Sequence, residues 1–175
     1  MSITDSEKNK WLSNLQETNT EFIDLLEAFL PEEINTVPFG GGWTAGQVAQ
    51  HVHKSDQGML MELTGPVKRE NRRPDQYADM ISKTFLDFET KLQSPAFIIP
   101  ESREYKKDFI ITRFKETRSK IGEAVQASDL TETCAAFPFP GVGELTKLEI
   151  INFVIVHTKR HIHQLRKIAG RMIRE

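Results

Sequence analysis

Two histidines, His157 and His161, lie four residues apart near the end of the chain. In an α-helix, residues at this spacing project from the same face, one turn above the other. Two imidazoles stacked in this way are how a helix offers two ligands to one metal ion. Apolar side chains share this face and indicate that it packs into a core: Ile150, Val154, Leu165 and Ile168. His163 falls among polar residues on the other side and is predicted to be solvated.

An alternative is that His157 and His161 are core histidines, each hydrogen-bonded to a neighbour. A buried imidazole is normally neutral and hydrogen-bonded. Two adjacent ones, however, have four ring nitrogens to satisfy within an apolar surface, and a metal ion binds one nitrogen of each. From these two residues, both alternatives stay open, because a metal site still needs a third ligand.

The third ligand is expected on another helix at a matching level. The segment 44–64 is the other predicted helix that contains histidine. His51 and His53 lie on opposite flanks of its apolar stripe, so helical geometry alone does not choose between them. Ser55 and Gly58 share the flank of His51 and leave room for a partner helix or a cavity, which weakly favours His51.

Helical periodicity accounts for most of the chain, and no alternating pattern of useful length predicts a strand. Pro95 and Pro100 bracket the apolar segment 96–99, which is predicted to be an extended crossover. We therefore predict an all-α fold, a four-helix bundle with long crossover connections and one extra shorter helical segment, forming a single domain over residues 1–175. The predicted helices span residues 7–30 with Ser6 as the cap, 44–64 and 146–172 with capping boxes, 75–92, and 103–127.

Composition limits the classes of function. Net charge is −2 with both signs interspersed, so no basic field favours nucleic acid or an anionic membrane. Cys134 is the single cysteine, which excludes an internal disulfide, suits a reducing cytoplasm and is expected to be an inert apolar residue. No signal peptide or membrane-spanning run is present. A cytoplasmic location and a small-molecule substrate are expected, without nucleic acid or membrane partners.

The segments 41–51, 143–146 and 157–165, together with the middle stretch 85–100, resemble the DinB-like superfamily, including its YfiT-like members. The most specific features are Trp43, eight positions before His51, and the histidine pair on the last helix. This resemblance covers most of the chain. It implies a four-helix bundle, often a homodimer, that holds a divalent metal through three histidines. By position these ligands are His51, His157 and His161, and His53 has no place in the pattern and stays a polar flank residue.

Three histidine ligands leave a coordination position for water or substrate, as catalytic sites do. Zinc or nickel is expected, with iron, cobalt or manganese as alternatives. Gln47 lies one turn before His51 and Gln164 one turn after His161, so each amide is predicted to accept a ring N–H. Aromatic residues on the linkers are predicted to line the mouth of the pocket: Trp43, Phe39, Phe137 and Phe139.

The resemblance also suggests a reaction. Characterised members of the superfamily include transferases that move a low-molecular-weight thiol onto an electrophile, so a metal-dependent thiol transferase is the first hypothesis. The second is a metal-dependent hydrolase with hydroxide as the nucleophile. The third is a stress-associated metal-binding protein without catalytic activity. No carboxylate in the sequence stands out as the general acid or base that either enzyme needs.

Overall fold

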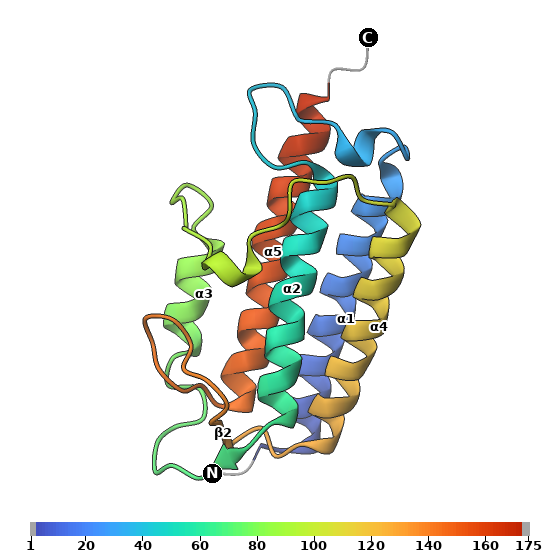
Figure 1. The fold of residues 1–175 in the computed structure, drawn as a ribbon. Helices are drawn as coiled ribbons and strands as arrows, with labels where there is room; N and C mark the ends of the chain where they lie inside the picture. Colours follow the sequence, from blue (N-terminus) through green and yellow to red (C-terminus); the bar gives the residue numbers. More distant parts are fainter. Residues whose placement is uncertain (1–2, 173–175) are drawn as a thin grey trace.

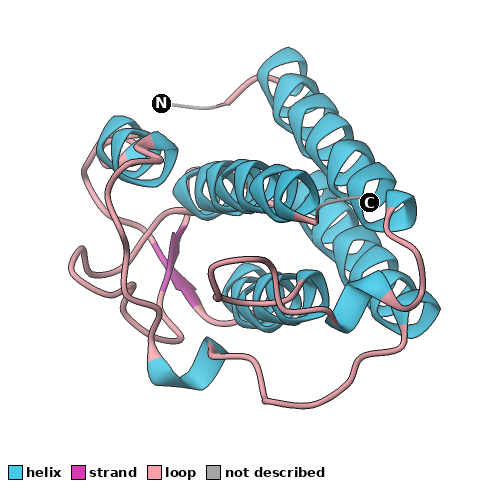
Figure 2. Cartoon of the chain, turned by 90° about the horizontal axis from the view of Figure 1, so that it is seen from above, coloured by secondary structure: helices cyan, strands magenta, loops and turns pink. Residues whose placement is uncertain are grey.

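The computed structural model describes residues 3–172, and the chain over this range is almost entirely helical. The shorter helix α3 (Ala78–Leu86) packs on the outside of α5, apart from the other helices when seen from above (Figure 2). Four long helices form a bundle (Figure 1): α1 (Asp5–Ala28), α2 (Ala45–Thr64), α4 (Lys107–Ala127) and α5 (Lys147–Arg171). The predicted four-helix bundle with one extra shorter helix is confirmed.

The order of the helices around the bundle differs from a simple up-and-down meander. α4 and α5 each pack against both α1 and α2, which places α1 and α2 diagonally opposite one another. α1 and α5 run in one direction, and α2 and α4 run in the other (Figure 1). Because α2 and α4 are parallel, the chain between them must travel the length of the bundle, and residues 65–106 do so. This connection, which includes α3, is the long crossover that the sequence predicted.

Three of the four long helices begin at a capping box, and α4, within residues 3–172, begins without a side-chain cap. In α1 the cap is Thr4, not Ser6 as predicted. Thr4 Oγ1 accepts the N–H of Glu7, and the Glu7 carboxylate accepts the N–H of Thr4 at 2.9 Å. This reciprocal pair satisfies two N–H groups at the helix start and leaves Ser6 inside the first turn. The other two capping boxes are the predicted ones: Thr44 with Gln47, and Thr146 with Glu149.

The helix predicted over 75–92 is shorter at both ends, because α3 spans Ala78–Leu86. Asp87 explains its end. The Asp87 carboxylate accepts the N–H of Glu89 at 3.1 Å and the hydroxyl of Thr90 at 2.6 Å. These side-chain bonds offer the backbone a turn in place of another helical turn. The helix therefore ends at Leu86, and the crossover continues from there.

The prediction that α4 begins at Arg103 is also wrong, since it begins at Lys107. The reason is a contact distant in sequence. The N–H of Tyr105 donates to Asn35 Oδ1 at 2.8 Å, and the carbonyl of Tyr105 accepts from Asn35 Nδ2 at 2.9 Å. The backbone of Tyr105 is thereby committed to the short helix η1 (Glu33–Asn35). Residues 96–99, predicted to be extended, contain one 3-10 turn, η2 (Ala96–Ile98).

One small antiparallel sheet ties the two loops at the lower end of the bundle together. It pairs β1 (Val67–Lys68) with β2 (Thr133–Cys134), and Cys134 lies opposite Val67. Cys134 is fully buried, and burial raises the pKa of its thiol to about 12. This agrees with the predicted inert cysteine. Over residues 3–172, no helix has both the length and the apolar character that a membrane span needs.

Candidate metal centre

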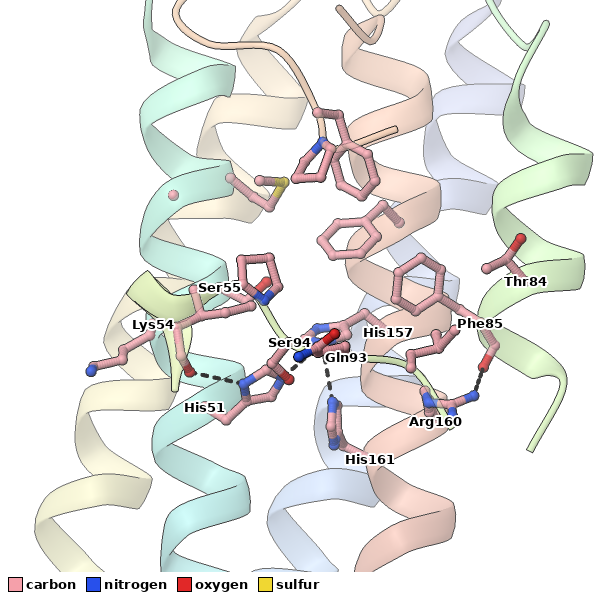
Figure 3. Close-up of a pocket in the computed structure, with 18 of the residues that line it drawn as sticks. His51, Lys54, Ser55, Thr84, Phe85, Gln93, Ser94, His157, Arg160 and His161 are labelled. Carbon is pink, nitrogen blue, oxygen red and sulfur yellow. Dashed lines mark hydrogen bonds between the residues drawn. The ribbon is translucent and has the colours of Figure 1, made fainter. Parts of the chain in front are cut away.

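Three histidine side chains converge between α2 and α5 (Figure 3). His51 projects from α2, and His157 and His161 project from α5. The Nε2 atom of His157 lies 3.1 Å from Nε2 of His51 and 3.0 Å from Nε2 of His161. All three side chains are buried. The pair four residues apart thus faces the core as predicted, and His51 is the second-helix histidine that meets it.

His51 is oriented by two elements that precede and follow it in the chain. Three consecutive glycines, Gly40 to Gly42, have positive φ, which side chains disfavour, and turn the chain into Trp43. The Trp43 ring then packs 5.0 Å from the imidazole of His51. On the other side, His51 Nδ1 lies 2.9 Å from the carbonyl oxygen of Ile98 in the crossover. A carbonyl only accepts, so this nitrogen carries the proton and donates.

The predicted role of Gln47 at His51 is wrong. Its amide oxygen accepts the backbone N–H of Thr44 at 3.0 Å and so completes the cap of α2. Gln164 does what the sequence predicted: its Oε1 accepts from His161 Nδ1 at 2.8 Å. Both glutamines are one turn from a histidine, but the first is needed at the helix start, where backbone N–H groups have no helical partner.

The hydrogen bonds at Nδ1 decide what the cluster presents at its centre. A neutral imidazole has one protonated nitrogen and one lone pair. Because His51 and His161 donate through Nδ1, both Nε2 atoms direct lone pairs at His157 Nε2. His157 has one N–H to give and its Nδ1 has no hydrogen-bond partner, so it cannot satisfy both neighbours. One cation between the three Nε2 atoms satisfies all of them, and the donor set therefore fits a divalent metal.

Electrostatics keep these rings in the state that binds a metal. Burial is the largest cause of the lowered pKa of each of them. The pKa of His161 falls to about 3, and that of His157 lies well below its usual range because two other imidazoles also surround it. All three are neutral at pH 7. A neutral imidazole has a free lone pair, which coordination requires.

The remaining two histidines lie outside the cluster, and both differ from expectation. His53 is buried against α4, with Nδ1 3.5 Å from Thr117 Oγ1, because α4 covers the flank that the sequence left open. Burial lowers its pKa to about 4. His163 is not fully solvated: its ring stacks on Phe88 with centroids 4.2 Å apart, since the segment after α3 folds over it.

A cavity of about 1,190 Å³ adjoins the cluster, and all three histidines line it. Its walls are mainly apolar and come from α2, α3, α5, the crossover and the loop before α5. Trp43, Phe137 and Phe139 line it as predicted, whereas Phe39 is exposed elsewhere. A buried donor set open to a cavity can bind a metal and also leave space for a substrate.

Sequence reasoning missed two groups at this site. The first is the Ile98 carbonyl, which no side-chain pattern reveals because it is backbone brought in from a distant loop. The second is Arg160, which lines the cavity. Its signal was present: Arg160 is three residues after His157 and adjacent to His161, on the edge of the same helix face.

Comparisons with known proteins agree with this fold. A curated relative, uncharacterized protein YuaE of Bacillus subtilis, is 24% identical over 168 residues, covering 93% of this chain and 99% of its own. YfiT of B. subtilis, a solved structure described as "a probable metal-dependent hydrolase with an unusual four-helix bundle topology", superposes with a TM-score of 0.63 at 17% identity over 98% of this chain and 90% of YfiT. The four-helix bundle protein TT2238, also a solved structure, superposes with a TM-score of 0.57 at 18% identity, over 91% of this chain and 98% of TT2238. The DinB superfamily model matches residues 14–165, and the chain belongs to the DinB superfamily.

Proposed function

We propose that the protein is a metal-dependent enzyme whose divalent cation is held by His51, His157 and His161. The main supporting observation is that the Nε2 lone pairs of His51 and His161 both point at Nε2 of His157 in a buried site. The description of YfiT as a probable metal-dependent hydrolase supports a metal in the same fold. Zinc or nickel suits three imidazoles, while iron, cobalt and manganese are alternatives.

A divalent cation at three histidines supplies a positive charge that lowers the pKa of a bound water or thiol at its open position. The chain's own residues orient the ligands. Ile98 fixes the ring of His51 and Gln164 that of His161, so the open side of the cluster faces the cavity. The apolar walls exclude water from a reacting pair of molecules.

Within this class, we propose transfer of a low-molecular-weight thiol to an electrophilic small molecule. The supporting observation is that, over the described residues, no aspartate or glutamate lines the cavity. Hydrolysis needs a base for water, whose ordinary pKa is about 15.7. A thiol with a pKa of about 8.5 needs far less help to lose its proton. The S–H bond breaks and its proton passes to solvent. The sulfur then forms a bond to the electrophilic carbon while the bond from that carbon to its leaving group breaks, and the leaving group departs with the electron pair, as chloride does from monochlorobimane.

A metal-dependent hydrolase is the second candidate, because the description of YfiT names that activity for a protein of the same fold. Both candidates use the same three histidines. They differ in whether a thiol is consumed, and this difference makes them separable in one assay.

The first experiment measures metal content after purification without chelators, by elemental analysis. We expect about one divalent metal ion per chain in the natural protein and strong loss of metal in His51→Ala, His157→Ala and His161→Ala. His53→Ala and His163→Ala are the matched controls, since they remove the other two imidazoles. Metal retained in the first three variants, or lost equally in all five, would contradict the assignment.

The second experiment measures thiol consumption with monochlorobimane as the electrophile and a panel of small thiols. A transferase consumes the thiol and loses this activity in His157→Ala, with His163→Ala active. Turnover of ester or amide substrates without any thiol would favour the hydrolase. A protein that binds metal but shows neither activity would instead support the non-catalytic alternative.

A further inference from the structure

The cavity beside the three histidines is larger than a small thiol needs. Its volume of about 1,190 Å³ lies just above the range of about 300–1,000 Å³ for drug-sized ligands. Most of the lining is apolar, with aromatic and methionine side chains from α2, α3, α5, the crossover and the loop before α5. A second substrate with a sizeable apolar body therefore fits the space next to the histidines.

An aromatic wall extends from the histidines along this cavity. The ring of Phe153 stacks on His157 with centroids 5.0 Å apart. Phe85 and Phe139 meet Phe153 edge-on, at 5.0 and 4.7 Å. Phe139 is partly buried and lies at the end of this row. Such a row offers faces and edges to an aryl or alkyl group along its whole length.

The charged residues that line the cavity are all cationic. The chain has 25 acidic and 23 basic residues, yet the lining has Lys54, Lys91, Arg160 and Lys167 and no carboxylate over the described residues. Lys54 is neutralised by Glu101 at 2.6 Å. The other three have no ion-pair partner within residues 3–172. Positive charge therefore prevails along the lining, although the Asp87 carboxylate lies near enough to Arg160 to interact with it electrostatically.

Arg160 makes three hydrogen bonds, more than any other of these cations. Its guanidinium donates to the carbonyl oxygens of Phe85 at 3.3 Å, of Asp87 at 2.7 Å and of Thr90 (Figure 3 shows the bond to Phe85). Three bonds occupy three of the five N–H groups of an arginine, and its Nε–H is among those left. A fixed guanidinium with free N–H groups is suited to a planar anion such as a carboxylate.

Lys167 follows Arg160 by seven residues, two helical turns on the same flank of α5. Lys91 comes from the crossover that closes over this flank. Both lysines are exposed and line the cavity. Positive charge is thus concentrated on one side of the cavity, beside the aromatic wall and close in sequence to His161.

We propose that the electrophilic substrate is an amphipathic carboxylate. Its aryl or alkyl body packs along Phe85, Phe139 and Phe153, and its carboxylate binds Arg160 with support from Lys167 and Lys91. This proposal rests on the proposed function in one respect only, that the reacting atom lies beside the histidines. The recognition itself depends on the cavity and not on the metal.

The test is calorimetric titration with three ligands that share a phenylpropyl body and differ in the end group: 4-phenylbutyrate, 4-phenylbutyramide and 4-phenylbutylamine. We expect the carboxylate to bind at least about tenfold more tightly than the amide and the amine to bind weakest. Arg160→Met and the double variant Lys91→Met/Lys167→Met should each reduce the preference for the carboxylate severalfold. Lys159→Met is the matched control, since this exposed lysine on α5 does not line the cavity. Arg160→Met also removes the hydrogen bonds to the carbonyls of residues 85, 87 and 90 and could therefore move this segment. The lysine double variant changes the positive charge without removing these bonds.

All titrations are repeated in His157→Ala, which removes the proposed metal ligand set. A carboxylate preference that persists there supports the anion site, even if the protein proves to bind no metal and to transfer no thiol. A preference that disappears there means that the carboxylate was ligating the metal, which overturns the anion site and leaves the proposed function intact. Equal affinity for the three ligands, binding of none of them, or an unchanged preference in the cation variants also overturns the proposal.

Discussion

Asp56 and Arg118 form a bidentate ion pair in the interior of the bundle, at 2.7 and 2.9 Å. Both side chains are almost completely buried. Arg118 also donates to Asn19 Oδ1 at 2.8 Å and to Thr158 Oγ1 at 2.6 Å. The network thus joins α1, α2, α4 and α5 at one level, and Thr158 is the neighbour of His157. It fixes the rotation of α5, on which the direction of His157 depends.

Asp56→Ala should destabilise the protein by about 3–5 kcal/mol, because it leaves the guanidinium of Arg118 buried without its carboxylate. Urea unfolding followed by circular dichroism measures this. Asp24→Ala, which removes an exposed carboxylate from α1, is the control and should change stability by less than about 0.5 kcal/mol. The double variant Asp56→Leu/Arg118→Met should be less destabilised than Asp56→Ala alone. Equal effects of Asp56→Ala and Asp24→Ala would show that the pair does not hold the bundle.

Glu149 and Glu7 occupy the same position in two capping boxes but differ in surroundings. Glu149 is fully buried and accepts two bonds from Arg72, at 3.0 and 2.9 Å, and the N–H of Tyr77 at 2.7 Å. Glu149→Gln should therefore cost about 2–3 kcal/mol, since it breaks bonds between charged groups. Glu7→Gln, at the exposed cap of α1, should cost less than about 0.5 kcal/mol. Comparable losses in the two variants would argue against a special role for the burial of Glu149.

The contacts that sequence reasoning predicted correctly are local ones. The boxes at Thr44 and Thr146 and the bond from His161 to Gln164 each join residues three positions apart, so helical spacing specifies them. The same reasoning failed where a distant side chain competes for the backbone. Asn35 holds Tyr105 away from α4, and the pairing of these residues, 70 positions apart, has no local signature.

The site shows the same division. Inward projection of His157 and His161 follows from the apolar stripe of α5, which their own helix displays. The choice between His51 and His53 does not follow from α2 alone, because both are buried and face different neighbours. It depends on which flank meets α5 and which meets α4, and that is set by the diagonal placement of α1 and α2. The resemblance to the superfamily supplied this choice, because the helical pattern of α2 places both histidines on the flanks of its apolar stripe.

Cys134 should be unreactive in the folded protein. Its thiol is buried and has a pKa of about 12, so at pH 8.5 it stays protonated, whereas an ordinary thiol of pKa about 8.5 is half ionised. The thiolate is the reactive form, and alkylation then requires opening of the structure. Iodoacetamide labelling at pH 8.5, followed by mass spectrometry, should proceed far more slowly than with free cysteine and should become fast in urea. Rapid labelling without denaturant would show that β2 is accessible.

Gln164 and Gln47 are two glutamines, each one turn from a proposed metal ligand, whose substitution should have different effects. Gln164 fixes the His161 ring through a bond at 2.8 Å, so Gln164→Ala should weaken metal affinity by about 10- to 100-fold, the usual effect of removing a group that orients a ligand. Gln47 instead caps α2 at 3.0 Å, so Gln47→Ala should lower the stability of the protein by about 1 kcal/mol and leave metal affinity nearly unchanged.

Competition titration with a chromogenic chelator measures the first quantity and urea unfolding the second. If Gln47→Ala weakened metal binding as much as Gln164→Ala, the loss would come from movement of α2 as a whole. The hydrogen bond from His161 would then have no separate part in holding the metal. The expected result separates the two roles, because one amide contacts an imidazole and the other contacts only backbone.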